Sequence, residues 1–290
     1  MPSPLRRVAV LTRHDPRLTA RALRELADEA RRLGLDLVVP PDERAKHRLT
    51  DADGFRTVDD DELRRADLCL VLGGDGTILR ALGRLLGSGV PTTGVNFGNV
   101  GFLASLRQDD WRAGLEQIVR GEYSVIELLT VEARLNGQRQ SAVNDIVLAR
   151  VRSQHVLRLV YSVSGTHVGE MLCDGLIVAS PAGSTAYNLS CDGPLVVWDA
   201  EALILNFIAP HSLGFRPLVL RPDHVIEVHN ASPSDEAEIL ADGTVVGRLC
   251  CGETVSIAAG TEHARLLIRQ DGSFYRNVEE KLFNHPRHDV

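Results

Sequence analysis

Strands and helices alternate in the hydrophobic pattern of the first part of the chain. Runs in which every residue is apolar occur at Val8–Leu11 and Leu68–Leu72, which is typical of strands covered on both faces. Between them, apolar residues recur at helical spacing from Leu18 to Leu33, and Gly34 ends that helix. The alternation predicts a parallel sheet with helices on both faces and ligands at the carboxyl ends of its strands.

Shorter segments complete this alternating pattern. Further strands are predicted at Leu35–Val39 and Thr93–Asn96, and helices at Asp59–Ala66 and Thr77–Leu86. The stretch Asp42–Thr57 is polar, carries mixed charges and follows a Pro-Pro pair, so it predicts a surface loop.

The pattern changes after about Leu106. One more helix is predicted near 109–120, and short β-rich segments separated by turns follow it. Asn136-Gly137 is a strong hairpin signal between a strand at 126–135 and a returning strand at 142–151. Further strands are predicted at Val156–Val163, Gly175–Ser180, Leu203–Ala209, Val225–Val228, Glu238–Leu240, Thr254–Ile257 and Ala264–Ile268.

These two patterns predict a fold that is α/β plus all-β. A Rossmann-like parallel α/β domain covers residues 1–106, and a β-sandwich domain of two packed sheets covers 107–270. A short helix is predicted at 185–190 within the second domain. The tail, roughly 271–290, is charged and aromatic, and we expect it to pack back on the first domain.

Composition narrows the class of protein. The 290 residues are 44% hydrophobic and carry a net charge of −7, so a nucleic-acid partner is not expected. No apolar run approaches the ~20 residues that span a bilayer. We therefore expect no membrane association, no signal peptide and a cytoplasmic protein. The five cysteines have neither the spacing of a zinc site nor that of a disulfide framework.

The stretch with the clearest chemistry is Gly73-Gly74-Asp75-Gly76-Thr77, between a buried strand and a helix. Its glycines allow the backbone to approach a ligand closely, and the helix N-terminus that follows favours a phosphate. It lacks the lysine of a P-loop and the spacing of the dinucleotide-binding glycines. Taken alone, Asp75 is either a turn and cap residue or a catalytic group.

Three later stretches narrow the choice. Asn144 and Asp145 lie side by side between apolar strand residues, although such a pair is often only a bulge or turn. The stretch Cys173–Ser190 combines a carboxylate, a strand, a Pro–Gly turn and a helix start rich in hydroxyl groups, one of which could be an ordinary N-cap. Ala241–Thr244 forms a third acidic turn that is weak by itself.

In this order the motifs resemble those of NAD kinases. That family combines the GGDGT turn, a paired Asn-Glu or Asn-Asp, a DG…TPTGSTAY(N/S)LS stretch and a late Asp-Gly turn. The loop Gly98–Leu103 and the stretch Pro210–Pro217 match two further family motifs. The resemblance spans about Leu68 to Thr244 and fits the two predicted domains.

The resemblance implies roles for individual residues. Asp75 matches the proton acceptor, and Asp174 matches a carboxylate that contacts the nicotinamide end, across a subunit interface in some arrangements. Asn144 and Asp145 match the pair that holds the ribose hydroxyls and the adenine side of NAD. The implied NAD-binding positions are Asp75, Gly76, Asn144, Asp145, His155, Asp174, Thr185, Ala186, Tyr187, Ser190, Ala209 and Thr244. The implied phosphate-binding positions are Gly73, Gly74, Gly76, Thr77 and Arg80, the last of which could equally be a solvated helix arginine.

The implied reaction is phosphoryl transfer to the 2′-hydroxyl of the adenosine ribose of NAD, giving NADP. Asp75 would accept the hydroxyl proton, and Mg²⁺ or another divalent cation would be held mainly by the donor phosphates. The donor is ATP or polyphosphate, since backbone N–H groups suit either. A homodimer or homotetramer is expected from the resemblance, with NAD and ATP as the small-molecule partners.

Four positions depart from the family pattern. Ala182 replaces a usual Thr or Ser, Asp192 a glycine, Leu172 a basic residue of some members, and Thr244 a common Gln or Asn. They leave the preference for NAD or NADH open. Two alternatives to an NAD kinase stay open: a lipid kinase that shares the GGDGT turn, and a sensor of the same fold that binds NAD(H) without turnover.

Overall fold

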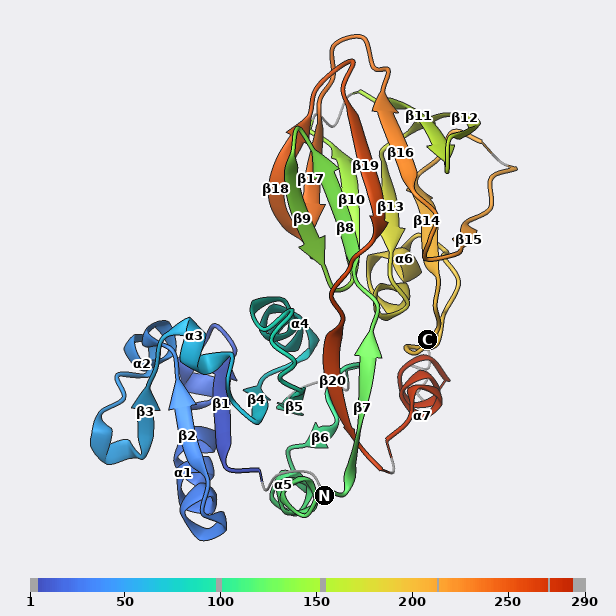
Figure 1. Cartoon of the computed structure of the whole chain (residues 1–290). Helices are drawn as coiled ribbons and strands as arrows, with labels where there is room; N and C mark the ends of the chain where they lie inside the picture. Colours follow the sequence, from blue (N-terminus) through green and yellow to red (C-terminus); the bar gives the residue numbers. More distant parts are fainter. Residues whose placement is uncertain (1–4, 98–100, 152–154, 213, 271, 284–290) are drawn as a thin grey trace, which may run out of the picture. The chain divides into compact units, whose positions relative to one another are not determined.

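Two compact units make up the chain. The first comprises Met1–Glu127 with Ala264–Val290, and the second comprises Leu128–His263 (Figure 1). The residues that this computed structural model describes are 5–97, 101–151, 155–212, 214–270 and 272–283.

One sheet organises the first unit. Within the described residues it has eight strands in the order β3-β2-β1-β4-β5-β20-β7, with β6 paired to β5. The pairs from β3 through to β20, and β5 with β6, are parallel, so these strands have their carboxyl ends at one edge. The strands are β1 Arg7–Thr12, β2 Asp36–Val39, β3 Phe55–Thr57, β4 Leu68–Leu72, β5 Thr92–Asn96, β6 Leu106–Arg107, β7 Tyr123–Leu128 and β20 Ala264–Arg269.

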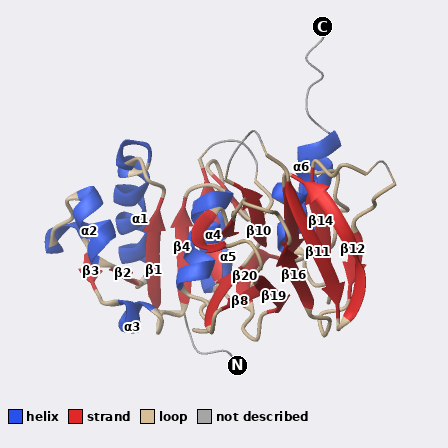
Figure 2. Ribbon diagram, turned by 90° about the horizontal axis from the view of Figure 1, so that it is seen from above, coloured by secondary structure: helices blue, strands red, loops and turns tan. Residues whose placement is uncertain are grey.

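Helices cover both faces of this sheet (Figure 1 and Figure 2). Helices α1 and α5 share one apolar core with Val8 and Val10, which point to the same face of β1. Helix α4 lies against the other face, where a Cβ atom on Gly94 would be 2.5 Å from Ile78 Cδ1. The helices are α1 Ala20–Leu33, α2 Pro41–His47, α3 Asp60–Leu63, α4 Asp75–Arg84, α5 Trp111–Val119 and α7 Phe274–Val278, with 3₁₀ turns η1 Pro16–Leu18 and η2 Asp51–Asp53 and a π-helical turn η4 Glu279–Phe283.

The second unit contains two antiparallel sheets. Among the described residues their orders are β15-β14-β13-β10-β17-β18 and β12-β11-β16-β19-β8-β9. The strands are β8 Val131–Leu135, β9 Gln138–Ala142, β10 Asp145–Arg150, β11 Leu157–Val163, β12 Thr166–Cys173, β13 Gly175–Ala179, β14 Leu203–Ile208, β15 Leu218–Leu220, β16 Ile226–Asn230, β17 Ala237–Ala241, β18 Thr244–Leu249 and β19 Thr254–Ala259. The 3₁₀ turn η3 Ala182–Thr185 and the helix α6 Tyr187–Ser190 follow β13.

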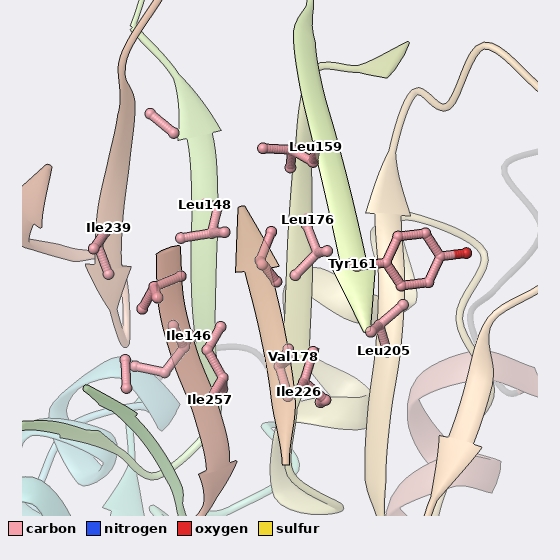
Figure 3. Packing of buried hydrophobic residues seen from close by; sticks show 14 of the residues in the cluster. Ile146, Leu148, Leu159, Tyr161, Leu176, Val178, Leu205, Ile226, Ile239 and Ile257 are labelled. Atoms are coloured by element: carbon pink, nitrogen blue, oxygen red, sulfur yellow. The ribbon is translucent and has the colours of Figure 1, made fainter. Parts of the chain in front are cut away.

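The core of the second unit lies between its two sheets. Alternate residues of β10 and β13, such as Ile146 and Leu176, point inward and meet residues of the other sheet, such as Leu159 and Ile257 (Figure 3). The opposite face of β10 and β13 carries a second apolar cluster around Val147, and Cys191 just after α6 packs against it. One face of this sheet is therefore core, and the other is covered by the region of α6.

The predicted fold class is confirmed, with its parallel α/β sheet and its antiparallel β unit. The C-terminal segment packs on the first unit, where Asn277 Nδ2 donates a hydrogen bond to Phe102 O at 2.7 Å. The loop prediction for Asp42–Thr57 is wrong, because helix α2 occupies Pro41–His47. A proline at the helix start, acids in its first turn and bases in its last are helix signals, and they outweigh the polarity of the stretch.

Two strand assignments also need correction. The hairpin at Asn136-Gly137 exists, but its returning strand is β9, a polar segment without an apolar alternation. Strand β10 instead pairs with β13 and β17 in the other sheet. The segment Ala264–Ile268, expected in the sandwich, is β20 of the parallel sheet. The unit boundaries therefore fall at 127/128 and 263/264, and not at the expected 106/107 and 270/271.

Phe207 provides a test of the core of the second unit. Its side chain is buried, and its ring lies 5.2 Å from that of Tyr161 and 4.8 Å from that of Phe215, in edge-to-face geometry. We expect Phe207→Ala to lower the free energy of unfolding by about 3–5 kcal/mol. The exposed control Val219→Ala should change it by less than about 0.5 kcal/mol.

The measurement is urea-induced unfolding of the second unit, followed by the fluorescence of Trp198 in a Trp111→Phe background. The two tryptophans lie in different units, so this background reports on the second unit alone. Equal urea midpoints for the two alanine variants would contradict the assignment of Phe207 to the core.

Candidate functional site

The glycine turn of the first unit joins β4 to α4. The strand is buried along its whole length, and Gly74 is the N-cap residue, so the helix begins at Asp75. A Cβ atom on Gly73 would be 2.7 Å from Thr77 Oγ1, which explains why the turn tolerates only glycine there. The N–H group of Thr77 already donates to Gly74 O at 2.9 Å, so the N–H groups of Asp75 and Gly76 are the ones that α4 offers to an anion.

Asp75 does not cap its own helix. Its carboxylate accepts hydrogen bonds from the backbone N–H groups of Phe102, at 2.7 Å, and Leu103, at 3.1 Å. A Cβ atom on Gly101 would collide with Asp75 Oδ1, so the loop backbone lies directly against the carboxylate. Lys281 Nζ lies 3.9 Å from Asp75 Oδ2, and about a third of each side chain is exposed. Residues 98–100 of the matching family loop lie outside the described residues.

A cavity of about 570 Å³, lined by two arginines and two aspartates, adjoins the turn. It lies at the carboxyl ends of β1, β4 and β5, where parallel sheets bind ligands. Arg80, one turn into α4, is exposed at the cavity and donates to Thr77 Oγ1 at 3.4 Å. The residues that line it are Arg13, His14, Asp15, Gly74, Asp75, Gly76, Thr77, Arg80 and Asn96. The five predicted phosphate-binding positions are thus all part of this turn or the helix after it.

A second cavity, of about 590 Å³, shares His14, Thr77 and Arg80 with the first. Its wall contains the buried carboxylate of Glu43, which accepts hydrogen bonds from Thr12 N at 3.0 Å and Thr12 Oγ1 at 2.7 Å. Lys46 Nζ completes this cluster at 2.7 Å from Glu43 Oε1. The sequence pattern does not indicate Glu43 and Lys46 as site residues, because both belong to α2, where the pattern predicts a loop.

The second unit gathers three of the predicted motifs at one turn. The carboxylate of Asp242 accepts hydrogen bonds from the backbone N–H groups of Val143, Asn144 and Asp145, at 2.9, 2.7 and 3.3 Å. Ser180 holds the other side of the turn, since its Oγ donates to Val143 O at 2.7 Å and its N–H to Asn144 O at 2.8 Å.

This turn leaves one polar atom without a partner. Among the described residues, nothing donates a hydrogen bond to Asn144 Oδ1, although the atom is buried. A buried acceptor without a donor is costly, and it is a position where a ligand hydroxyl would be favourable. The backbone of Gly183 lies against Asn144 O so closely that a Cβ atom would collide with it. Asn144 is therefore fixed from two sides and ready for a ligand donor.

Asp145 is a buried carboxyl group beside a second acid. Burial, and then the charge of Asp242, raise the pKa of Asp145 to about 7. Burial raises the pKa of Asp242 as well, although its three N–H donors act in the opposite direction. Asp145 lies on the same face of β10 as Val147, the face that the region of α6 covers.

Other predicted residues lie at the opposite end of the same strands. Asp145 pairs with Ala179, whereas Asp174 precedes Gly175, so the two acids are five residues apart along the sheet, or roughly 17 Å. Asp174 forms an ion pair with Arg150 at 2.8 Å. Ala209 directly follows the residue of β14 that pairs with Gly175.

His155 also belongs to this distant end. Its Nδ1 lies 2.9 Å from Asp235 Oδ1, and Arg150 Nη1 donates to its carbonyl oxygen at 3.4 Å. Asn144 and Asp145 therefore lie at the Asp242 turn. Asp174, Ala209 and His155 lie at the other end of these strands. Thr244 begins β18 next to the Asp242 turn, at the Asp145 end.

Helix α6 precedes Cys191, which packs against the apolar cluster around Val147. A buried amide network fixes the helix, in which Asn188 Nδ2 donates to Ser184 O and Asn206 Nδ2 donates to Asn188 Oδ1. Tyr187 is 45% exposed, and burial followed by the charges of neighbouring acidic groups, Asp174 and Asp145 among them, raises the pKa of its phenol.

The remaining positions of this segment have mixed exposure. Ser190 is exposed, Ala186 is half-buried, and Thr185 Oγ1 donates to Ala182 O at 3.1 Å. Asp192, which departs from the family glycine, has a φ of 57°. Aspartate tolerates this left-handed conformation better than most residues, so the glycine is replaced at modest cost.

Neither a metal cluster nor a membrane-spanning helix occurs among the described residues. They contain no group of three or more His, Cys, Asp or Glu side chains arranged to hold a metal ion. None of their helices is both long enough and apolar enough to span a bilayer.

Comparison with protein families adds two matches. Residues 18–123 match the ATP-NAD kinase N-terminal domain, and residues 143–269 match the ATP-NAD kinase C-terminal domain. The NAD kinase of Heliobacterium modesticaldum is 37% identical over 227 residues, which are 77% of this chain and 80% of that protein. The NAD kinase of Moorella thermoacetica is 36% identical over 229 residues, 78% of this chain and 74% of that protein.

Solved structures show the same fold. Yeast NADH kinase complexed with NADH superimposes with a TM-score of 0.88 at 23% identity, covering 100% of this chain and 91% of that one. The NAD kinase from Archaeoglobus fulgidus in complex with ATP gives a TM-score of 0.75 at 26% identity, covering 94% and 97%.

The raised pKa of Asp145 predicts a pH-dependent stability. Between pH 4 and 7 the carboxyl group is protonated in the folded chain but ionised in the unfolded one. The free energy of unfolding is therefore unaffected by Asp145 below about pH 4, and it falls progressively as the pH rises from there to about 7. Asp145→Asn cannot ionise, so the variant should be more stable than the parent above pH 7, by up to about 4 kcal/mol.

Urea unfolding of both proteins at pH 5 and pH 8.5 measures this difference, with the Trp198 fluorescence described above. The advantage of the variant should shrink toward pH 5. A constant difference between the two proteins, or a larger one at pH 5, would show that Asp145 is ionised throughout.

Proposed function

Because the chain belongs to the NAD kinase family, we propose that it transfers a phosphoryl group from ATP to the 2′-hydroxyl of the adenosine ribose of NAD, with Asp75 as the general base. The observation that carries this proposal is the position of Asp75. Its carboxylate lies in the first turn of a helix, beside a cavity at the carboxyl edge of a parallel sheet.

The cavity beside Asp75 contains groups that suit the phosphates of the donor. The N–H groups at the start of α4, together with Arg13 and Arg80, offer fixed donors and positive charge to oxygen atoms. ATP is the donor that the names of the matched family domains imply, and the Archaeoglobus relative binds it. Polyphosphate would suit the same backbone groups. A divalent cation, Mg²⁺ above all, would neutralise phosphate charge while held mainly by the donor itself.

The turn of the second unit suits the acceptor. Asn144 Oδ1 is a buried acceptor without a donor, and Asp145 beside it accepts hydrogen bonds once ionised. Ribose hydroxyl groups supply such donors. We assign the remaining NAD contacts to Gly76, Thr185, Ala186, Tyr187, Ser190 and Thr244.

The chemistry then requires one proton transfer. Each oxygen of Asp75 keeps a lone pair after it accepts its loop N–H group, so the carboxylate can still accept the 2′-hydroxyl proton. The ribose oxygen bonds to the transferred phosphorus as the bond from phosphorus to the leaving nucleotide breaks. General-base assistance of this kind contributes about 10²- to 10⁴-fold in rate.

Asp174, His155 and Ala209 lie too far from Asp145 to serve the same nucleotide end within one chain. We therefore assign them to the nicotinamide side or to a second subunit, which fits a homodimer or homotetramer. A monomer in sedimentation velocity would contradict the subunit assignment. We also infer a cytoplasmic location, where both substrates are available. The geometry favours neither a lipid kinase nor a sensor without turnover.

The role of Asp75 is tested by Asp75→Asn. We expect kcat to fall by at least about 10²-fold while NAD still binds, because asparagine keeps the shape but cannot take the proton. NADP formation with ATP and, separately, with polyphosphate is the measurement, and NAD binding is followed by calorimetry. Asp15→Asn is the matched control, since Asp15 lines the same cavity but is engaged with Arg17. Near-normal turnover in Asp75→Asn would contradict the assignment of Asp75 as the general base.

Arg80 provides a separate test of the donor site. Arg80→Met should raise the KM for ATP about tenfold, equivalent to about 1.4 kcal/mol, with a much smaller effect on the KM for NAD. The control Arg21→Met removes an exposed arginine from α1, where it pairs with Glu25. Equal changes in both KM values would argue against a phosphate contact.

A further inference from the structure

The C-terminal segment 272–283 reaches Asp75 as a consequence of topology. Strand β20 is parallel to β5, so it ends at the same edge of the sheet as β4 and β5. The chain that follows β20 therefore emerges at the edge where the glycine turn lies. Ser273 caps α7 by accepting from Arg276 N at 3.1 Å, which starts the helix at this edge.

Two side chains of this segment hold Phe102. Asn277 Nδ2 donates to Phe102 O at 2.7 Å, and Lys281 Nζ lies 4.4 Å from the centre of the Phe102 ring. The two residues are four positions apart, and both contact the same target. Phe102 is itself buried, and its N–H group donates the shorter of the two backbone hydrogen bonds that Asp75 accepts. The segment thus fixes the loop that fixes the carboxylate.

Lys281 also faces the carboxylate directly, at 3.9 Å from Asp75 Oδ2. The choice of lysine is unusual in this chain, where only Lys46 and Lys281 are lysines among 32 Lys and Arg residues. A lysine presents a compact point charge on a flexible stem, whereas an arginine would present a wide planar fork. Both groups carry the positive charge that faces Asp75, so an arginine at this position would keep the charge and change only its shape.

We propose that Lys281 is a positioning residue for the base of the reaction, which it serves by pairing with Asp75 and by holding Phe102 against it. The inference rests on the proposed role of Asp75. Lys281 itself forms and breaks no covalent bond: the hydroxyl proton passes to Asp75, and the phosphoryl group passes to the ribose oxygen. When Asp75 gains the proton, its negative charge is lost, and the ammonium group is left to face the phosphate charge in the neighbouring cavity.

The first experiment is a kinetic comparison of Lys281→Met with Lys281→Arg. A base displaced by about 1 Å can lose about 10²-fold in rate, so we expect Lys281→Met to lower kcat by about 10- to 100-fold. The KM for NAD should change by much less, because no NAD contact is assigned to this segment. Lys281→Arg keeps the charge and should recover most of the lost kcat.

A structural role alone would not produce this pattern. A variant that merely loosened the tail would lower thermal stability, and restoring the charge with arginine would not restore kcat. Glu279→Met, at an exposed position of the same turn, is the matched control and should leave kcat unchanged. Thermal unfolding of each variant shows whether the first unit remains folded.

The second experiment detects the contact without measuring activity. Reductive methylation with ¹³C-formaldehyde labels the ammonium groups of the two lysines and the terminal amine, and it keeps their charge. The signal that disappears in Lys281→Arg belongs to Lys281. Asp75→Asn should shift that signal and leave the signal of Lys46 in place. An unmoved Lys281 signal would overturn the proposed pairing.

The outcomes separate the inference from the function beneath it. If Asp75→Asn is inactive and Lys281→Met has near-normal or higher kcat, the inference fails and the base remains. If Asp75→Asn stays active, both the base and its positioning residue are overturned. Loss of kcat in Lys281→Met with recovery in Lys281→Arg, together with the shifted signal, supports the inference.

Discussion

The contact on which the catalytic end of the first unit depends is that between the Asp75 carboxylate and the backbone of the following loop. Two N–H groups, from Phe102 and Leu103, fix both carboxylate oxygens. The approach is so close that only glycine fits at position 101. A carboxylate that is held by backbone groups loses little further freedom when a substrate arrives, and such preorganisation is what lowers a reaction barrier. The loop and the turn therefore act as one element.

The second unit uses the same device with a different acid. Asp242 accepts three backbone N–H groups and thereby fixes the turn that carries Asn144 and Asp145. Gly183 approaches that turn as closely as Gly101 approaches Asp75. In both units one carboxylate accepts several backbone hydrogen bonds, and a glycine allows the neighbouring chain to approach closely. The difference lies in the role that we propose for each acid, since Asp242 supports the turn that carries Asn144 and Asp145, whereas Asp75 is the proposed base.

The sequence predicted the fold class better than it predicted which strands pair with one another. The apolar strands and the glycine turn follow from local pattern, whereas the role of Asp75 as the base came only from the resemblance of the motifs to those of NAD kinases. Strand β20 could not be placed from its own residues, because a short apolar run suits either sheet and only long-range pairing decides. The mixed charges around Glu43 predict a loop, although the carboxylate of Glu43 is buried and accepts a hydrogen bond from Thr12. The separation of Asp174 from Asp145 depends on strand register, which motif order does not contain.

Asp145 and Asn144 show what this preorganisation costs the folded chain. A buried carboxyl group with a raised pKa and a buried carbonyl without a donor both disfavour the unliganded fold. A ligand that donates hydrogen bonds to both groups removes both penalties at once, so part of the folding free energy is returned as affinity. Residues that lower stability and face a prepared turn are therefore stronger functional indicators than the well-packed strands that hold them.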